Sequence, residues 1–196
     1  MAQAKVAPLV NAKKLLQQAG EGVTSAFLGR LSAEDQELYE NLLPTMWVPI
    51  EQVSRMVKLA AELLLINDPE GLEKLGQIQA RRDLSTVYKL FVAVSSVSFV
   101  VKQAGKMWNT YHQKGSVQVQ KDPDRNRILF VVEDYEDMPM EFAKLLTGWI
   151  LGLAEMTGIR NTNRLALGMS ITFCVLVGLL ALRLHHLHKA KKQAAM

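Results

Sequence analysis

Few residues in this chain have the types and spacing that catalysis or metal binding requires. His112 is the only histidine before the C-terminal tail, and no carboxylates stand at a metal-ligand spacing from it. The sequence also lacks a glycine-rich phosphate-binding loop and a serine in a nucleophile-elbow pattern. We therefore predict a protein that is not an enzyme, with no catalytic residues, no metal site and no cofactor.

Two other groups of residues contain possible cation ligands. One is an acidic stretch formed by Glu133, Asp134, Glu136, Asp137 and Glu141. Acidic runs of this kind are usually solvated surface. The other is the tail, where His185, His186 and His188 stand among basic residues, and this composition suits a polar segment at an interface better than a metal site.

Aromatic residues are the remaining candidates for a binding site. Trp47, Trp108 and Trp149 are spread along the chain. Tryptophans most often pack in a core, but they can equally line an apolar pocket, which is the usual form of a ligand site.

The composition predicts one folded domain with an appendage. The chain has 196 residues, of which 49% are hydrophobic and 21% are charged, so a packed core is expected. The single cysteine, Cys174, excludes an internal disulfide. The formal net charge of +4 is spread over the sequence, which argues against a nucleic-acid-binding surface.

The first half of the chain contains residues that typically start and end short helices. Ser32 followed by Asp35 is close to a capping box, and Pro49 suits the first turn of a helix. Ile50, Val53 and Val57 then follow helical spacing. A further helix is expected to start after the Asp68-Pro-Glu sequence.

The second half changes from helical to alternating periodicity. Residues 97–114 have the pattern of a long helix ended by Gly115, and residues 116–133 predict a β-hairpin around a turn-rich loop. Pro139 opens a last helix with a wide apolar stripe that contains Phe142 and Trp149. The expected fold class is therefore α+β, mostly helical with a small antiparallel β-hairpin.

A charge-free run near the C-terminus predicts one transmembrane helix. It begins at Leu165 and ends at Leu182, with Arg164 and Arg183 on either side. Eighteen residues in a helix span roughly 27 Å, close to the thickness of the hydrocarbon core of a bilayer. The predicted organisation is a soluble α+β domain over 1–163, a transmembrane anchor over 164–184 and a basic tail over 185–196.

Localisation and partners follow from this organisation. Residues 1–22 lack the apolar run of a signal peptide, so we expect a single-pass membrane protein whose main domain is cytoplasmic. The predicted partners are membrane lipids, contacted by Leu165 to Leu182 and by the basic tail, and a second copy of the chain or another protein. The expected alternative is a fully soluble domain in which 165–182 belongs to the core.

Four short motifs carry a resemblance to a known superfamily. They are Leu43-Pro-x-x-Trp47-x-Pro49, Leu84-x-x-Val-Tyr88-x-Leu-Phe91, Trp108-x-x-Tyr111-x-x-x-Gly115 and Gly148-Trp149. Residues 31–159 resemble uncharacterised myxobacterial-type proteins that are distantly similar to the heme-NO-binding, 4-vinyl-reductase and TRAPP-subunit superfamily. The resemblance implies helices packed on a small antiparallel sheet, an apolar interior that often holds a ligand, and a tendency to dimerise.

The sequence departs from that superfamily at its most diagnostic positions. The heme sensors carry Tyr-x-Ser-x-Arg, and no tyrosine here is followed by that pattern. The second hairpin expected after the last helix is replaced by the apolar run that contains Cys174.

These observations lead to a membrane-anchored, non-enzymatic interaction or ligand-sensing module. Its apolar pocket or dimerisation surface has six candidate residues, which are Trp47, Tyr88, Phe91, Trp108, Tyr111 and Trp149. The alternatives are a heme-like cofactor sensor ligated by His112, an enzyme with a polar cleft, and a pore-forming helical protein with a tail anchor, against which the hairpin argues.

Overall fold

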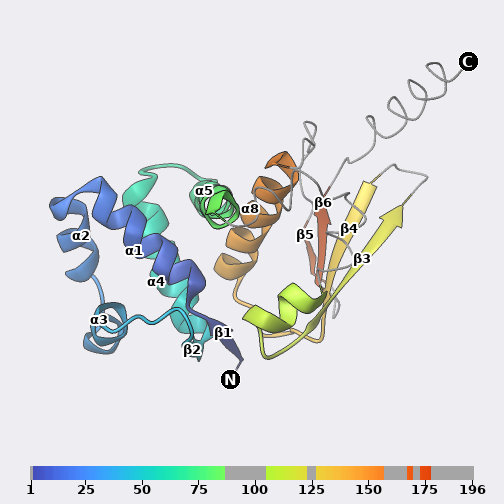
Figure 1. Ribbon diagram of the computed structural model, residues 1–196, viewed down its shortest axis with the longest axis horizontal. Helices are drawn as coiled ribbons and strands as arrows, with labels where there is room; N and C mark the ends of the chain where they lie inside the picture. The colour runs from blue at the N-terminus through green and yellow to red at the C-terminus, as the bar shows by residue number, and fades with distance from the viewer. Residues whose placement is uncertain (1, 87–104, 123–126, 157–166, 170–172, 178–196) are drawn as a thin grey trace, which may run out of the picture.

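A computed structural model describes residues 2–86, 105–122, 127–156, 167–169 and 173–177 of the chain. The helices pack on one another, and the last of the labelled helices lies beside a small antiparallel sheet (Figure 1). The described part is therefore a mostly helical α+β fold, as the sequence predicts. The N-terminal elements are β1 (Gln3–Lys5), α1 (Ala7–Ala19), α2 (Glu21–Leu28), α3 (Ala33–Glu40), β2 (Trp47–Pro49), α4 (Ile50–Leu64) and α5 (Gly71–Thr86).

Local sequence signals set the boundaries of these helices. The Ser32 hydroxyl accepts a hydrogen bond from the Asp35 backbone N–H at 3.2 Å, so Ser32 caps α3 as the capping-box pattern predicts. The Asp35 carboxylate then accepts hydrogen bonds from Arg55 at 2.6 and 2.7 Å and from Gln52 at 2.8 Å. This buried carboxylate joins α3 to α4.

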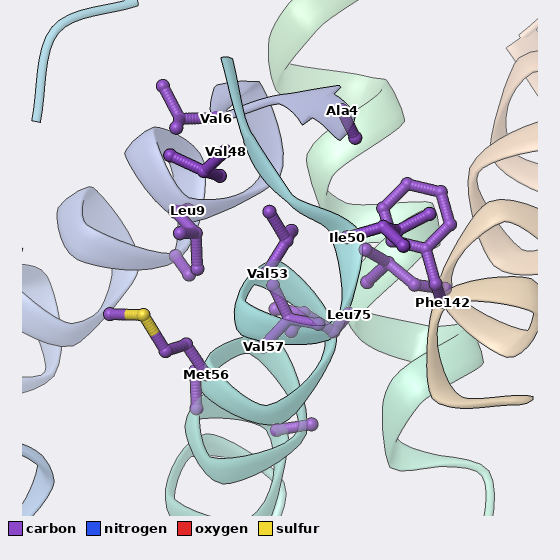
Figure 2. Close-up of a cluster of buried hydrophobic side chains, with 14 of the residues drawn as sticks. Ala4, Val6, Leu9, Val48, Ile50, Val53, Met56, Val57, Leu75 and Phe142 are labelled. Carbon is purple, nitrogen blue, oxygen red and sulfur yellow. The ribbon is translucent and has the colours of Figure 1, made fainter. Parts of the chain in front are cut away.

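Helix α4 is the centre of the N-terminal core. Ile50, Val53 and Val57, which share one helical face, are fully buried. Figure 2 shows their side chains gathered with those of Leu9 from α1 and Leu75 from α5. The helical spacing seen in the sequence therefore marks the buried face of α4, because residues three and four apart lie on the same side of a helix.

The C-terminal half contains a four-stranded antiparallel sheet in the order β3-β4-β6-β5. Strands β3 (Ser116–Asp122) and β4 (Arg127–Glu133) form the predicted hairpin, in which Val117 is opposite Val132 and Val119 is opposite Phe130. Helix α8 (Met140–Met156) follows and lies between α5 and this sheet (Figure 1).

The predicted transmembrane helix is wrong over the part of 165–182 that the structure describes. β5 (Leu167–Met169) and β6 (Phe173–Val177) are paired strands, and β6 also pairs with β4, with Val131 opposite Cys174. A charge-free run suits a membrane helix and a strand buried in a sheet equally well, because both environments exclude charge. Over Phe173–Val177, pairing with β4, which is distant in sequence, shows a strand.

Among the described residues, no helix is both long enough and apolar enough to span a bilayer. The tail over 185–196, Arg164 and Arg183 lie outside the described residues, as do most positions of the predicted anchor. The predicted division of the chain into domain, anchor and tail stays untested.

Glycines allow α5 and α8 to pack with their backbones in contact. A Cβ atom added to Gly148 would overlap the carbonyl oxygen of Glu73, and one added to Gly76 would overlap the carbonyl oxygen of Leu145. A Cβ on Gly152 would lie 2.9 Å from the Gln77 carbonyl oxygen. This close packing holds the two helices that form one wall of the site described next.

Candidate functional site

The candidate site is built around a histidine at the end of a short helix. Residues 105–111 are helical, so Trp108 and His112 lie one turn apart and their rings stack with centroids 3.9 Å apart. The Trp108 Nε1–H donates to the Lys114 carbonyl oxygen at 3.1 Å, which ties the helix to the turn before β3. The four-residue spacing on this helix therefore holds the His112 ring against the face of the Trp108 ring.

The N-terminal strand holds the backbone of the same histidine. Ala4 forms an antiparallel bridge with His112, and the Gln113 N–H donates to the Gln3 carbonyl oxygen at 3.2 Å. On its other edge, β1 pairs with β2, with Ala4 opposite Val48. β1 thus links the N-terminal helices to the histidine.

The His112 side chain is buried among aromatic rings. It is 7% exposed, and the rings of Phe142 and Tyr135 meet it edge-on at 5.4 and 6.0 Å. Its Nδ1 atom is buried without a hydrogen-bond partner among the described residues. Burial lowers the pKa of His112 to about 4, so the imidazole is neutral at pH 7.

A cavity of about 170 Å³ lies beside this histidine. Its walls come from α1, α5, the 105–112 segment, β3, β4 and α8, and most of its surface is apolar. The lining residues are Lys5, Ala7, Pro8, Gln79, Asp83, Met107, Trp108, Tyr111, His112, Val117, Phe130, Val132, Phe142, Leu145, Leu146, Trp149, Ile150 and Leu153. Helices and strands from both halves of the chain therefore line one half-open, mostly apolar space.

Two charged side chains reach the cavity wall. The Asp83 carboxylate accepts hydrogen bonds from Asn11 Nδ2 at 2.8 Å and from Trp149 Nε1 at 3.1 Å. The ammonium group of Lys5 donates to the Thr45 carbonyl oxygen at 3.0 Å and lies 4.8 Å from the centre of the Trp47 ring. The Lys5 charge is thus held at β2, whereas the Asp83 charge lies beside Trp149 in the cavity wall.

Three of the six aromatic pocket candidates surround the cavity, namely Trp108, Tyr111 and Trp149. Trp47 is not among the lining residues; it lies on β2 opposite Lys5, where its ring faces the Lys5 ammonium group. Tyr88 and Phe91 lie outside the described residues.

Sequence reasoning missed several residues of the cavity wall. Gln79, Asp83 and Phe130 were not among the pocket candidates. Phe142 was assigned only to an apolar helix stripe and His112 only to a heme site. Gln79 and Asp83 are four residues apart on α5, and this spacing predicts that they share one helical face. The spacing does not predict that this face meets α8.

The acidic stretch does not form a metal site in the described part of the chain, where no cluster of three or more potential ligands occurs. Three of its five members have separate partners. Asp137 pairs with Lys114 at 2.9 Å, Glu141 pairs with Lys58 at 3.1 Å, and Glu133 accepts from the Gln118 amide at 2.7 Å.

Comparison with known proteins identifies the fold. No family model and no curated protein matches the sequence. Among solved structures, an H-NOX protein from S. oneidensis in the Fe(II) ligation state has 12% identity and a TM-score of 0.61, covering 91% of this chain and 98% of that one. The chain has the H-NOX fold.

Other solved structures support the same assignment. The S. oneidensis H-NOX protein in the Fe(II)NO state has a TM-score of 0.60 at 12% identity, covering 87% of this chain and 96% of that one. An oxygen-binding H-NOX domain related to soluble guanylate cyclases has a TM-score of 0.55 at 12% identity, covering 85% and 88% respectively. The resemblance to the heme-NO-binding superfamily is thereby confirmed at the level of fold.

His112 suits a heme iron, but the volume and the charge of the cavity do not fit a heme. A neutral, buried His112 with an unpartnered nitrogen is a suitable iron ligand. The cavity of about 170 Å³, however, is smaller than the roughly 300–1,000 Å³ of pockets for drug-sized ligands. Heme propionates also need cations, and in the described part of the lining Lys5 is held elsewhere while Asp83 adds negative charge.

Proposed function

We propose that this chain is a non-enzymatic ligand-sensing domain that holds one small ligand with an apolar ring body beside His112. The observation that carries the proposal is the mostly apolar cavity lined by elements from both halves of the chain, with a neutral imidazole in its wall. The size and apolar lining suit a small ring system, because five Phe, Trp and Tyr side chains that line the cavity offer faces and edges for ring stacking. These are Trp108, Tyr111, Phe130, Phe142 and Trp149.

Sensing follows from where the cavity lies. A ligand in it would contact α1, α5, α8 and the β3–β4 hairpin at once. If these elements adopt two arrangements, a ligand that contacts one arrangement better shifts the population toward it. β1 is the natural connection, since its Lys5 borders the cavity, its Ala4 forms a bridge with His112, and the strand pairs with β2.

The test is calorimetric titration of the protein with 2-phenylethanol. Leu146 lines the cavity and Leu151, on the same helix, does not. We expect the wild type and the Leu151→Trp variant to bind with similar affinity. The Leu146→Trp variant should bind at least about tenfold more weakly, because the larger ring occupies the apolar space that the ligand fills. Equal affinity in both variants would contradict the proposal.

Hemin is the second probe, because the fold is that of heme proteins. We expect no Soret band after reconstitution with hemin, for the reasons of volume and charge given above. A Soret band that is lost in the His112→Ala variant would replace this proposal with a heme sensor in which His112 is the iron ligand.

Membrane attachment and homodimerisation stay predictions. The strands β5 and β6 support the alternative in which 165–182 belongs to the core. Alkaline carbonate fractionation of the full chain decides the question of attachment, and sedimentation velocity decides that of pairing. Retention in the carbonate-washed pellet would favour the anchor.

A further inference from the structure

Asp83 has the position of a ligand anchor in the cavity wall. It lies on α5, and its two carboxylate oxygens accept one hydrogen bond each, from Asn11 on α1 and from Trp149 on α8. Three helices thus orient one carboxylate at the cavity that Trp149 also lines. A carboxylate can accept about four hydrogen bonds, so two neutral donors leave room for a third partner.

The charge of Asp83 is not paired within the described part of the chain. Its neighbour Arg81 pairs with Glu155 at 2.8 Å, and Arg82 donates to the Gln18 side chain at 2.7 Å. Lys5 is held by Thr45 and Trp47. Asn11 and Trp149 are uncharged donors, so they orient the carboxylate without neutralising it.

From this geometry we infer that the cavity selects a cationic arylalkyl ligand, namely an aromatic body with a protonated amine that meets Asp83. This inference rests on the proposed function, because it names the class of ligand for the same cavity. The aromatic body would contact the apolar wall formed by Trp149, Phe142 and Leu146. The amine would donate to Asp83 in a charge-assisted hydrogen bond.

Three probes of matched shape test the inference. They are phenethylamine, 2-phenylethanol and 3-phenylpropionate, which share a phenylethyl body and differ in the charge of the head group. We expect the wild type to bind the amine most tightly and the carboxylate most weakly in calorimetric titrations at pH 7. Asp83→Asn should weaken the amine about fivefold and leave the alcohol unchanged, because a partly solvated charge-assisted hydrogen bond is lost.

A matched control distinguishes the loss of the Asp83 charge at the cavity from a change in the net charge of the protein. Asp137→Asn removes an equal charge from an exposed ion pair with Lys114 that does not border the cavity. It should leave all three affinities unchanged. An amine affinity that is the same in Asp83→Asn and the wild type, with the alcohol still bound, overturns the inference and leaves the proposed function standing. Binding of none of the three probes to the wild type overturns both.

Salt provides a measurement that needs no variant, should Asp83→Asn fold poorly. Raising sodium chloride from about 0.05 M to about 0.5 M should weaken phenethylamine binding severalfold, because salt screens a partly exposed charge pair. The affinity for 2-phenylethanol should not fall. Equal salt dependence of the two probes contradicts a role for the Asp83 charge.

Discussion

His112 is unusual at the scale of a single residue, because it is a titratable group kept neutral by its surroundings. Trp108 covers one face of the imidazole, and Phe142 and Tyr135 meet the ring edge-on. These rings exclude water without supplying a charge partner, so the protonated form is disfavoured. The side chain is thereby available as a hydrogen-bonding group in a mostly apolar wall.

The low pKa of His112 predicts a pH-dependent stability. In the unfolded chain the imidazole has its ordinary pKa near 6.5, and in the folded chain the value is about 4. Between these values the unfolded state binds more protons, so the free energy of unfolding falls as pH is lowered from about 6.5 toward 4. The slope should approach about 1.4 kcal/mol per pH unit.

Urea unfolding at pH 7 and pH 5 measures this effect. The His112→Phe variant keeps a ring against Trp108 and removes the titrating group, so it should lose less stability than the wild type between the two pH values. The tail histidines are present in both proteins and cancel. An identical loss in the two proteins would mean that His112 is not the group responsible.

At the scale of elements, the close packing of α5 and α8 depends on glycines, which have no side chain. Gly76, Gly148 and Gly152 let the two helix backbones approach until little room is left between them. Trp149 and Leu153 project from α8 and Gln79 and Asp83 from α5 to the cavity, so the same packing sets the shape of its wall.

Gly148→Ala should therefore lower the free energy of unfolding by about 2 kcal/mol, since an added methyl group in a filled contact forces the backbones apart. Gly22→Ala is the control, because α2 leaves open space around that residue and alanine is a better helix former. It should be neutral or slightly stabilising. Chemical denaturation of both variants measures the difference, and equal stabilities would contradict the close packing of α5 and α8.

At the scale of the whole molecule, the sheet depends on residues distant in sequence. β6 pairs with β4 along five positions, from Ile128 opposite Val177 to Val132 opposite Phe173. β4 thereby lies between β3 and β6 and is not an edge strand. The helix α8 packs over this sheet, so loss of β6 would expose both β4 and a part of the α8 surface.

A chain that ends at Asn163 should consequently be much less stable than the full chain. It lacks β5 and β6, and its melting temperature should fall by about 10 °C or more, because several kcal/mol of strand pairing and burial are lost. A chain that ends at residue 184 keeps both strands and should melt close to the full chain. If the shorter chain melts like the full one, 165–182 is not part of the core.

Much of the fold was predictable because its signals are local. The Ser32 cap, the buried face of α4 at Ile50, Val53 and Val57, and the hairpin over 116–133 all depend on residues close in sequence. The superfamily resemblance rested on packing residues, and it was sufficient for the fold because packing is what relatives of one fold share.

The candidate site was only partly predictable, because a cavity is a property of several elements together. Trp108 and Trp149 were recognisable by residue type, but Asp83 became significant only where α5 meets α1 and α8. The run that contains Cys174 was ambiguous for the same reason. Its uniform apolarity fits both a strand of a sheet and a membrane helix, and over Phe173–Val177 only the pairing of β6 with β4 shows a strand. Local sequence thus determined the helices and the hairpin, whereas tertiary contacts decided which apolar surfaces face each other and where they leave a space.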